Sequence, residues 1–173
     1  KFCVSFPISF ASKFFNIPLV IYESNIILGR ANKILAPFSK KIFLSKKKIE
    51  NYPKKYEFKT HYVGSIVDKK IINYKIIKKN ENNSFSVLVL GGSQGAEIFG
   101  DIIPPVIDKL KSQGFSIKIA HQCIPTQRKK ILDFYEKNNI ENYVFEFNKD
   151  IVELLASSDL AITRSGASTT AEL

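Results

Sequence analysis

The chain has 173 residues, of which 45% are hydrophobic and 24% are charged, a composition typical of a globular protein and not of a disordered one. Its net charge is +10, and its two cysteines and two histidines form neither a CxxC pair nor a metal-ligand spacing, which argues against a zinc site and favours a reducing, cytoplasmic setting. No apolar run approaches the roughly 20 residues that a membrane-spanning helix needs. The chain has no methionine and stops at Leu173 within an expected helix, so we expect both termini to lie inside a longer protein.

The first half of the chain contains helices and strands in a loose alternation. The expected elements are a helix near Phe6–Phe15, a strand at Pro18–Tyr22, a helix at Arg30–Ala36, and strands at Lys41–Leu44 and His61–Val63. A polar, Asn-rich stretch at Lys75–Asn83 is typical of a hinge between domains. We therefore expect one domain over residues 1–78, a linker at 79–84 and a second domain over 85–173.

The second half alternates strands and helices more clearly. The expected strands are Ser86–Leu90, Ser116–Ala120, Tyr143–Phe147 and Leu160–Thr163, and the expected helices are Glu97–Gln113, Thr126–Asn138, Ile151–Ser157 and one starting near Ser168. We expect Pro104 and Pro105 to bend or restart the first of these helices. Strands that alternate with helices of this length predict a parallel α/β sheet.

The positive charge is confined to one part of the chain. Residues 1–83 hold 17 Lys or Arg against 5 Asp or Glu, whereas residues 84–173 hold 9 against 11. A lysine-rich composition can reflect an AT-rich genome, but such a bias would act on both halves alike. We expect the basic half to face something anionic, and a membrane surface fits better than a nucleic acid, because 16 of its 17 basic residues are lysines and it lacks the pattern of a stacking platform.

Polar or small residues follow each expected strand, where open parallel sheets bind ligands. The sharpest of these segments is GGSQGA at Gly91–Ala96. A strand that leads through glycines into a helix offers backbone N–H groups and a positive dipole end to an anion such as a diphosphate. The segment matches neither GxGxxG nor a Walker loop, and a plain tight turn is the alternative.

A second strand–loop–helix segment is RSGASTTAEL at Arg164–Leu173. Thr169 and Glu172 stand at capping-box spacing, so in one alternative Glu172 reaches back to cap the start of the helix. In the functional alternative, Glu172 accepts hydrogen bonds from ribose hydroxyls while Ser168 and Thr169 donate to phosphate. The residues alone do not separate the two.

These two segments, together with IPLVIYESNIILGRANK, resemble the MurG family, whose pattern there is IPxxxHEQNxxxGxxNK; HYVGS likewise resembles the strand before that family's GNPVR. The resemblance runs through the whole chain in order. It implies a GT-B glycosyltransferase fold, with two Rossmann-like domains that are both incomplete in this chain. It also implies inverting, metal-independent transfer of N-acetylglucosamine from UDP-GlcNAc to the undecaprenyl-diphosphate muramoyl-pentapeptide of peptidoglycan synthesis.

The resemblance also implies site residues. Ser93 and Gln94 correspond to residues that meet the donor diphosphate, and Asn148 to the position whose backbone recognises uracil. Ser168, Thr169 and Glu172 correspond to the phosphate- and ribose-binding group, and Asn25 to the asparagine of HEQN in the cleft. Glu23 and Asn32 fall on the acceptor side.

Two motifs depart from the family's pattern. His-Glu-Gln-Asn is Tyr22-Glu23-Ser24-Asn25 here, and Asn-Pro-Val-Arg is Ser65-Ile66-Val67-Asp68, which places an acid where the family has an arginine. The family's candidate catalytic histidine corresponds to a position before residue 1. Glu23 is the one acid of the chain at a plausible cleft position for a base, although a solvated loop acid is the more ordinary interpretation.

The implied partners are UDP-GlcNAc as a substrate, the lipid-linked acceptor and an anionic membrane surface, with no cofactor and no metal because the sequence has no Asp-x-Asp. The implied location is peripheral, on the cytoplasmic face of the bacterial inner membrane. Two alternatives stay open. One is another GT-B enzyme that uses a different UDP-sugar, and the other is a non-catalytic UDP-binding subunit of a split transferase.

Overall fold

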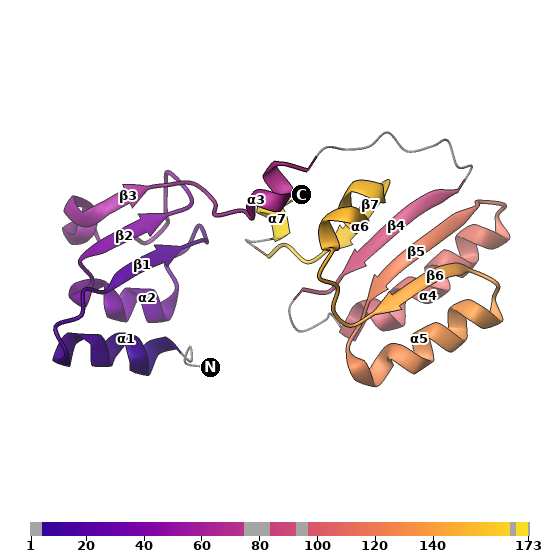
Figure 1. Cartoon of the computed structure of the whole chain (residues 1–173), viewed down its shortest axis with the longest axis horizontal. Coiled ribbons are helices and arrows are strands. Elements are labelled where there is room, and N and C mark those ends of the chain that lie inside the picture. The colour runs from indigo at the N-terminus through magenta and orange to yellow at the C-terminus, as the bar shows by residue number, and fades with distance from the viewer. Residues whose placement is uncertain (1–4, 75–83, 93–96, 167–168, 173) are drawn as a thin grey trace. The chain divides into compact units, whose positions relative to one another are not determined.

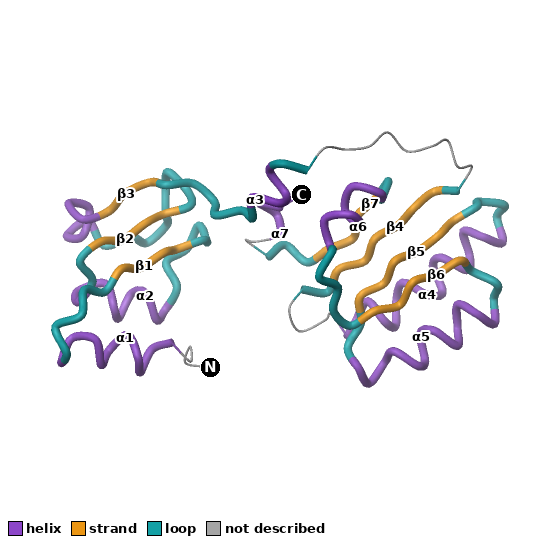
Figure 2. The backbone as a smooth tube through the Cα atoms, viewed as in Figure 1, coloured by secondary structure: helices purple, strands orange, loops and turns teal. Residues whose placement is uncertain are grey.

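A computed structural model describes residues 5–74, 84–92, 97–166 and 169–172 (Figures 1 and 2). The chain divides into two compact units, Lys1–Val67 and Asp68–Leu173, which we call the N-terminal unit and the C-terminal unit. All of the expected linker at 79–84 except Ser84 lies outside the described residues. The domain boundaries expected from the sequence therefore stay predictions.

The N-terminal unit is a small parallel sheet with the strand order β1-β2-β3. A buried cluster made by Ile21, Leu35 and Ile42 joins the sheet to the second helix, because alternate side chains of each strand point to that face. Figure 1 shows α1 and α2 on the same side of this sheet. The elements are α1 (Ser5–Phe14), β1 (Val20–Glu23), α2 (Arg30–Leu35), the 3-10 helix η1 (Ala36–Phe38), β2 (Lys41–Leu44), the 3-10 helix η2 (Lys54–Lys59) and β3 (Thr60–Tyr62).

The C-terminal unit is a four-stranded parallel sheet with the strand order β6-β5-β4-β7. Strand β4 is buried along all of its length after Phe85, as expected for a central strand covered on both faces. The elements are α3 (Lys69–Ile72), β4 (Phe85–Leu90), α4 (Glu97–Ser112), β5 (Ile117–Gln122), α5 (Pro125–Lys137), β6 (Glu141–Phe145), α6 (Ile151–Ser157), β7 (Leu160–Thr163) and α7 (Thr169–Glu172).

Helices cover both faces of this sheet (Figure 1). Val87 and Val89 of β4 pack on the face covered by α4 and α5, whereas Leu88 and Leu90 pack on the face covered by α6. The chain moves outward from β4 to β6 and then returns to pair β7 with the other side of β4. Because parallel crossovers are right-handed, this reversal places α6 on the opposite face and creates a switch point between β4 and β7.

Several element bounds differ by up to two residues from the sequence-based expectations, and the differences at β6 and α4 have a clear physical reason. Strand β6 begins at Glu141, two residues earlier than expected, because it pairs with β5 from Lys118↔Glu141 onward. Helix α4 runs through Pro104 and Pro105 without restarting. Pro104 is buried on the core face of the helix, and this packing offsets the hydrogen bonds that the two prolines cannot donate.

Candidate functional site

The switch point of the C-terminal unit brings the ends of β4 and β7 together. These strands are adjacent and parallel, paired from Val87↔Leu160 to Leu90↔Thr163, so the two segments that follow them leave the same edge of the sheet. Gly92 has φ +80, which side chains rarely adopt, and a Cβ there would meet no atom within 4 Å. The backbone at Gly92 is therefore open to close approach by a ligand.

A hollow of about 190 Å³ lies beside this switch point. Apolar side chains make much of its lining, and Asn148 and Thr169, two of the residues expected from the sequence, belong to it. Its volume is below the ~300 Å³ of a typical small-molecule pocket, so it can hold one ring of a nucleotide but not a whole sugar nucleotide. The lining residues are Leu90, Gly92, Gln122, Phe145, Phe147, Asn148, Ile151, Leu155 and Thr169.

Asn148 shapes the turn that leads from β6 into α6. Its side-chain Oδ1 accepts a hydrogen bond from the Asp150 N–H at 2.7 Å, and its Nδ2 lies 3.5 Å from the hydroxyl of Tyr143. The side-chain oxygen is thus engaged within the loop. The role expected for the backbone at position 148 stays a prediction.

The expected diphosphate and ribose contacts fall largely outside the described residues. Ser93, Gln94 and Ser168 lie there, as does the side chain of Glu172, whose backbone ends α7. Next to them, the Thr170 N–H donates to the Gly166 carbonyl at 2.9 Å and starts the short helix α7. The roles expected of these four residues stay predictions.

His121 is a core residue and not part of the site. It is 0% exposed, and its Nδ1 lies 2.8 Å from the hydroxyl of the equally buried Tyr135. Burial lowers the pKa of His121 to about 4, so the imidazole is neutral at physiological pH. From its place at the end of an expected strand, His121 could be either a structural or a rim residue, and its burial supports the structural alternative.

In the N-terminal unit, Glu23 is the centre of a hydrogen-bond network. Glu23 is only 2% exposed, so the interpretation as a solvated loop acid is wrong. Its carboxylate accepts from the Asn25 backbone (3.0 Å) and side chain (2.9 Å), from the Gly29 N–H (2.8 Å) and from Asn32 Nδ2 (2.9 Å). The structure thus brings Glu23 and Asn32, both expected on the acceptor side, together with Asn25, the expected cleft asparagine, while their roles stay predictions.

The network also decides the proton affinity of Glu23. Burial by itself raises the pKa of this carboxyl, but the hydrogen bonds from Gly29, Asn32 and Asn25 outweigh burial, and the pKa falls below its ordinary value. A carboxylate whose oxygens are already engaged and whose pKa is lowered is a poor base. The role of Glu23 as a base, the weakest of the sequence-based hypotheses, loses physical support.

A contact that the sequence did not reveal closes the neighbouring loop. The hydroxyl of Tyr22 donates to the Gly64 carbonyl at 3.2 Å and accepts from the Ile66 N–H at 3.1 Å. Ile66 stands where the family's pattern has a proline, which has no N–H to donate. Tyr22 and Ile66, which both differ from the family's pattern, therefore form a hydrogen bond with each other. Only the tertiary structure shows that these two differences are linked.

Asp68, the acid at the position of the family's arginine, has a local partner. Its side chain caps α3 by accepting from the Lys70 N–H at 2.8 Å. It is not among the residues that line the hollow. Across the described residues, no group of His, Cys, Asp and Glu could hold a metal ion, and no helix is long and apolar enough to cross a membrane.

The fold defines the C-terminal unit as a doubly wound α/β domain with a hollow at its switch point. Residues 86–173 match the glycosyltransferase family 28 C-terminal domain. This match covers just over half of the chain, and the chain therefore belongs to glycosyltransferase family 28.

Curated relatives match along almost the whole chain. The UDP-N-acetylglucosamine–N-acetylmuramyl-(pentapeptide) pyrophosphoryl-undecaprenol N-acetylglucosamine transferase of Pelagibacter ubique is 34% identical and covers 98% of this chain and 47% of the relative. The protein with the same name from Rickettsia felis is 38% identical over 95% of this chain and 48% of its own length. The chain thus spans about half the length of the curated relatives it matches.

A solved structure confirms the fold class. The crystal structure of MurG from Acinetobacter baumannii superposes with a TM-score of 0.63 and 23% identity, over 95% of this chain and 45% of that protein. The expected GT-B class, with a parallel sheet in each of two Rossmann-like units, agrees with this likeness.

Proposed function

We propose that this chain is part of an inverting, metal-independent transferase that moves N-acetylglucosamine from UDP-GlcNAc to an undecaprenyl-diphosphate-linked muramoyl-pentapeptide. The proposal is supported by membership of family 28 and by relatives whose names state this donor and acceptor. The C-terminal unit would bind the uridine nucleotide, and the Glu23 network of the N-terminal unit would contribute to the acceptor side.

The hollow beside Gly92 is the observation that carries the donor half of the proposal. Its two phenylalanines, Phe145 and Phe147, offer apolar surface to a planar ring, and the turn at Asn148 offers backbone polar groups to the edge of that ring. Thr169, at the start of α7, also lines the hollow. We infer that the uracil ring enters the hollow and that the diphosphate extends toward residues 92–96.

The inverting chemistry would need a base for the acceptor hydroxyl and stabilisation of the departing diphosphate. Backbone N–H groups after Gly92 would supply the stabilisation in place of a metal ion. We assign no base to the described residues, since Glu23 is engaged and His121 is buried.

Two measurements test the proposal. Calorimetry should show that UDP binds this chain more tightly than ADP or GDP, since the hollow would select the smaller pyrimidine ring. Labelled transfer assays with a polypeptide of the relatives' length that contains this chain should show GlcNAc transfer to the lipid-linked acceptor. Transfer of another sugar from its UDP form would favour a different UDP-sugar enzyme. UDP binding without any transfer would favour a binding subunit.

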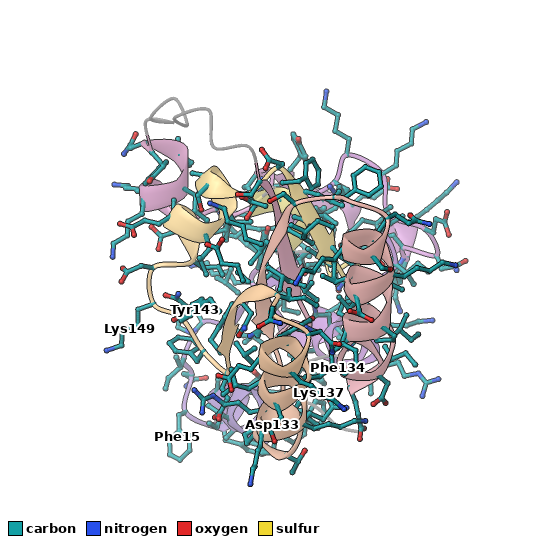
Figure 3. The ribbon with its side chains drawn as sticks, turned by 90° about the vertical axis from the view of Figure 1, so that its right-hand side faces the viewer. Phe15, Asp133, Phe134, Lys137, Tyr143 and Lys149 are labelled. Carbon is teal, nitrogen blue, oxygen red and sulfur yellow. The ribbon has the colours of Figure 1, made fainter. Side chains whose placement is uncertain are left out.

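We also propose that the N-terminal unit rests on an anionic membrane surface, at the cytoplasmic face of the inner membrane. Phe14 and Phe15 at the end of α1 are 73% and 75% exposed, and Phe15 projects away from the ribbon in Figure 3. Lys13 lies beside them with its Nζ 4.3 Å from the centre of the Phe38 ring. Further exposed cations of this unit are Arg30, Lys33, Lys40 and Lys41.

Replacing both exposed phenylalanines should weaken membrane binding. Phe14→Ser with Phe15→Ser removes apolar surface that would enter the headgroup region, and we expect at least tenfold weaker partitioning onto anionic vesicles in a sedimentation assay. Phe115→Ser is the matched control, because Phe115 is exposed (57%) but lies in the C-terminal unit. Equal binding of the wild type to neutral and anionic vesicles at low salt would contradict the proposal that the cations of this unit attract it to anionic lipid.

A further inference from the structure

Gln127 is a polar residue buried between two helices of the C-terminal unit. It lies in the first turn of α5 and is only 9% exposed. Its side-chain Nε2 donates to the carbonyl of Glu97 at 3.0 Å, and Glu97 is the first residue of α4. The bond therefore joins the first turns of α4 and α5. Because these helices follow β4 and β5, the contact lies at the carboxyl edge of the sheet, as the hollow does.

Gly100, one turn into α4, makes room for the amide of Gln127. An added Cβ at Gly100 would lie 2.8 Å from the Cδ of Gln127 and closer still to its Oε1, so a side chain there would push the amide away from Glu97. Gly100 does not have a positive φ, and a glycine inside a helix weakens it relative to alanine. The backbone conformation therefore does not require this glycine, whereas the amide of Gln127 does.

Stability alone does not account for the amide of Gln127. The Glu97 carbonyl is already the acceptor for the N–H of Asp101 in the i→i−4 pattern of a helix. No described residue donates to Gln127 Oε1, and a buried acceptor without a partner costs free energy. An apolar side chain of similar size would avoid this cost. What the amide adds is a directed contact that fixes where α4 begins relative to α5.

We propose that Gln127 is a positioning residue that holds the amino end of α4 in place for the diphosphate of the nucleotide. This inference rests on the proposed function, in which the diphosphate extends toward residues 92–96, directly before α4. Hydrogen bonds from backbone N–H groups to an anion depend on direction as well as distance, so a small displacement of the helix start weakens them. Neither Gln127 nor Gly100 lines the hollow. Gln127 would therefore affect binding of the diphosphate and not of the uracil ring.

Gln127→Met tests this role, because methionine has a similar length and no hydrogen-bond donor. In calorimetric titrations of this chain, we expect the variant to bind UDP about tenfold more weakly than the wild type does, and to bind uridine, which has no diphosphate, equally well. Lys130→Gln is the matched control, because the ion pair of Lys130 with Asp101 (2.9 Å) also joins α5 to α4 but its side chains are 70% and 50% exposed. It should change neither affinity.

Gly100→Ala is a second test and keeps the inference falsifiable if Gln127→Met fails to fold. Alanine favours the helix but displaces the amide of Gln127, so we expect the same selective loss of UDP affinity. In Gln127→Ala there is no amide to displace, and adding Gly100→Ala to that variant should cause no further loss of UDP affinity. Losses that simply add in the double variant would contradict the inference.

The two ligands also separate failure of this inference from failure of the proposed function. A wild type that prefers UDP to uridine and a Gln127→Met variant that keeps this preference, or that loses affinity for both ligands equally, would overturn the inference alone. A wild type that binds UDP no more tightly than uridine would refute the proposed diphosphate site. Hydrogen exchange of the Asp101 N–H, expected to be faster in Gln127→Met, would still decide whether Gln127 holds the start of α4.

Discussion

Acidification from pH 7 to pH 4 is expected to destabilise the C-terminal unit through His121 on the order of 3 kcal/mol, given its pKa of about 4 against an ordinary value near 6.5. Because burial lowers the pKa in the folded state, the unfolded chain binds the proton first as the pH falls. The contribution is therefore complete above pH 6.5 and is lost as the pH approaches 4. Denaturant unfolding at several pH values would measure how steeply the free energy of unfolding depends on pH.

The neighbours of His121 cannot balance the positive charge that its imidazole would gain on protonation. Tyr135 and Cys123 are also buried, and burial raises the pKa of both groups, so each stays neutral in this range. His121→Gln should retain a hydrogen bond to Tyr135 but has no imidazole to protonate. Between pH 7 and pH 4 its free energy of unfolding should therefore fall by ~3 kcal/mol less than that of the wild type. His61→Gln is the control, because His61 is the chain's other histidine and is exposed. The free energy of unfolding of this variant should depend on pH as it does in the wild type. Equal slopes for all three proteins would rule out this account of His121.

Gly92→Val is expected to weaken UDP binding at least tenfold, or by about 1.4 kcal/mol. Gly92 has φ +80, a conformation that a β-branched residue avoids, and its Cβ position faces open space beside the hollow. A valine there would strain the turn and occupy the place where the nucleotide approaches the backbone. Calorimetric titration of the folded variant with UDP measures the loss.

Gly114→Val separates the effect of strain from the effect on the site. Gly114 has φ +94 and likewise no atom within 4 Å of an added Cβ, but it follows α4 and leads into the amino end of β5. We expect Gly114→Val to lose a comparable amount of stability and to keep wild-type UDP affinity. If both variants bind UDP as tightly as the wild type, the glycine loop is only a turn.

The strand–helix alternation of residues 85–173 was predictable because local pattern alone determines it. The apolar run at Ser86–Leu90 indicated a strand buried on both faces, and the structure confirms β4 as the central strand. Parallel strands between helices also predicted that the polar ends would share one edge, since every strand ends on the same side. The resemblance to the family assigned Asn148 and Thr169, which are 21 positions apart, to the donor nucleotide, and both line one hollow in the structure.

The sequence by itself therefore determined the α/β class, the resemblance to its family and the segments of the candidate site. Only the tertiary structure decided the state of individual polar groups, because burial and hydrogen bonding depend on residues distant in sequence. The sequence indicated that Glu23 is a solvated loop acid, yet its carboxylate is buried and accepts hydrogen bonds from Gly29 and Asn32. His121 stood at a strand end like a rim residue, yet Tyr135 of α5 encloses it. The hydroxyl of Tyr22 likewise accepts a hydrogen bond from the N–H of Ile66, 44 positions further along the chain, and no local sequence pattern predicts that contact.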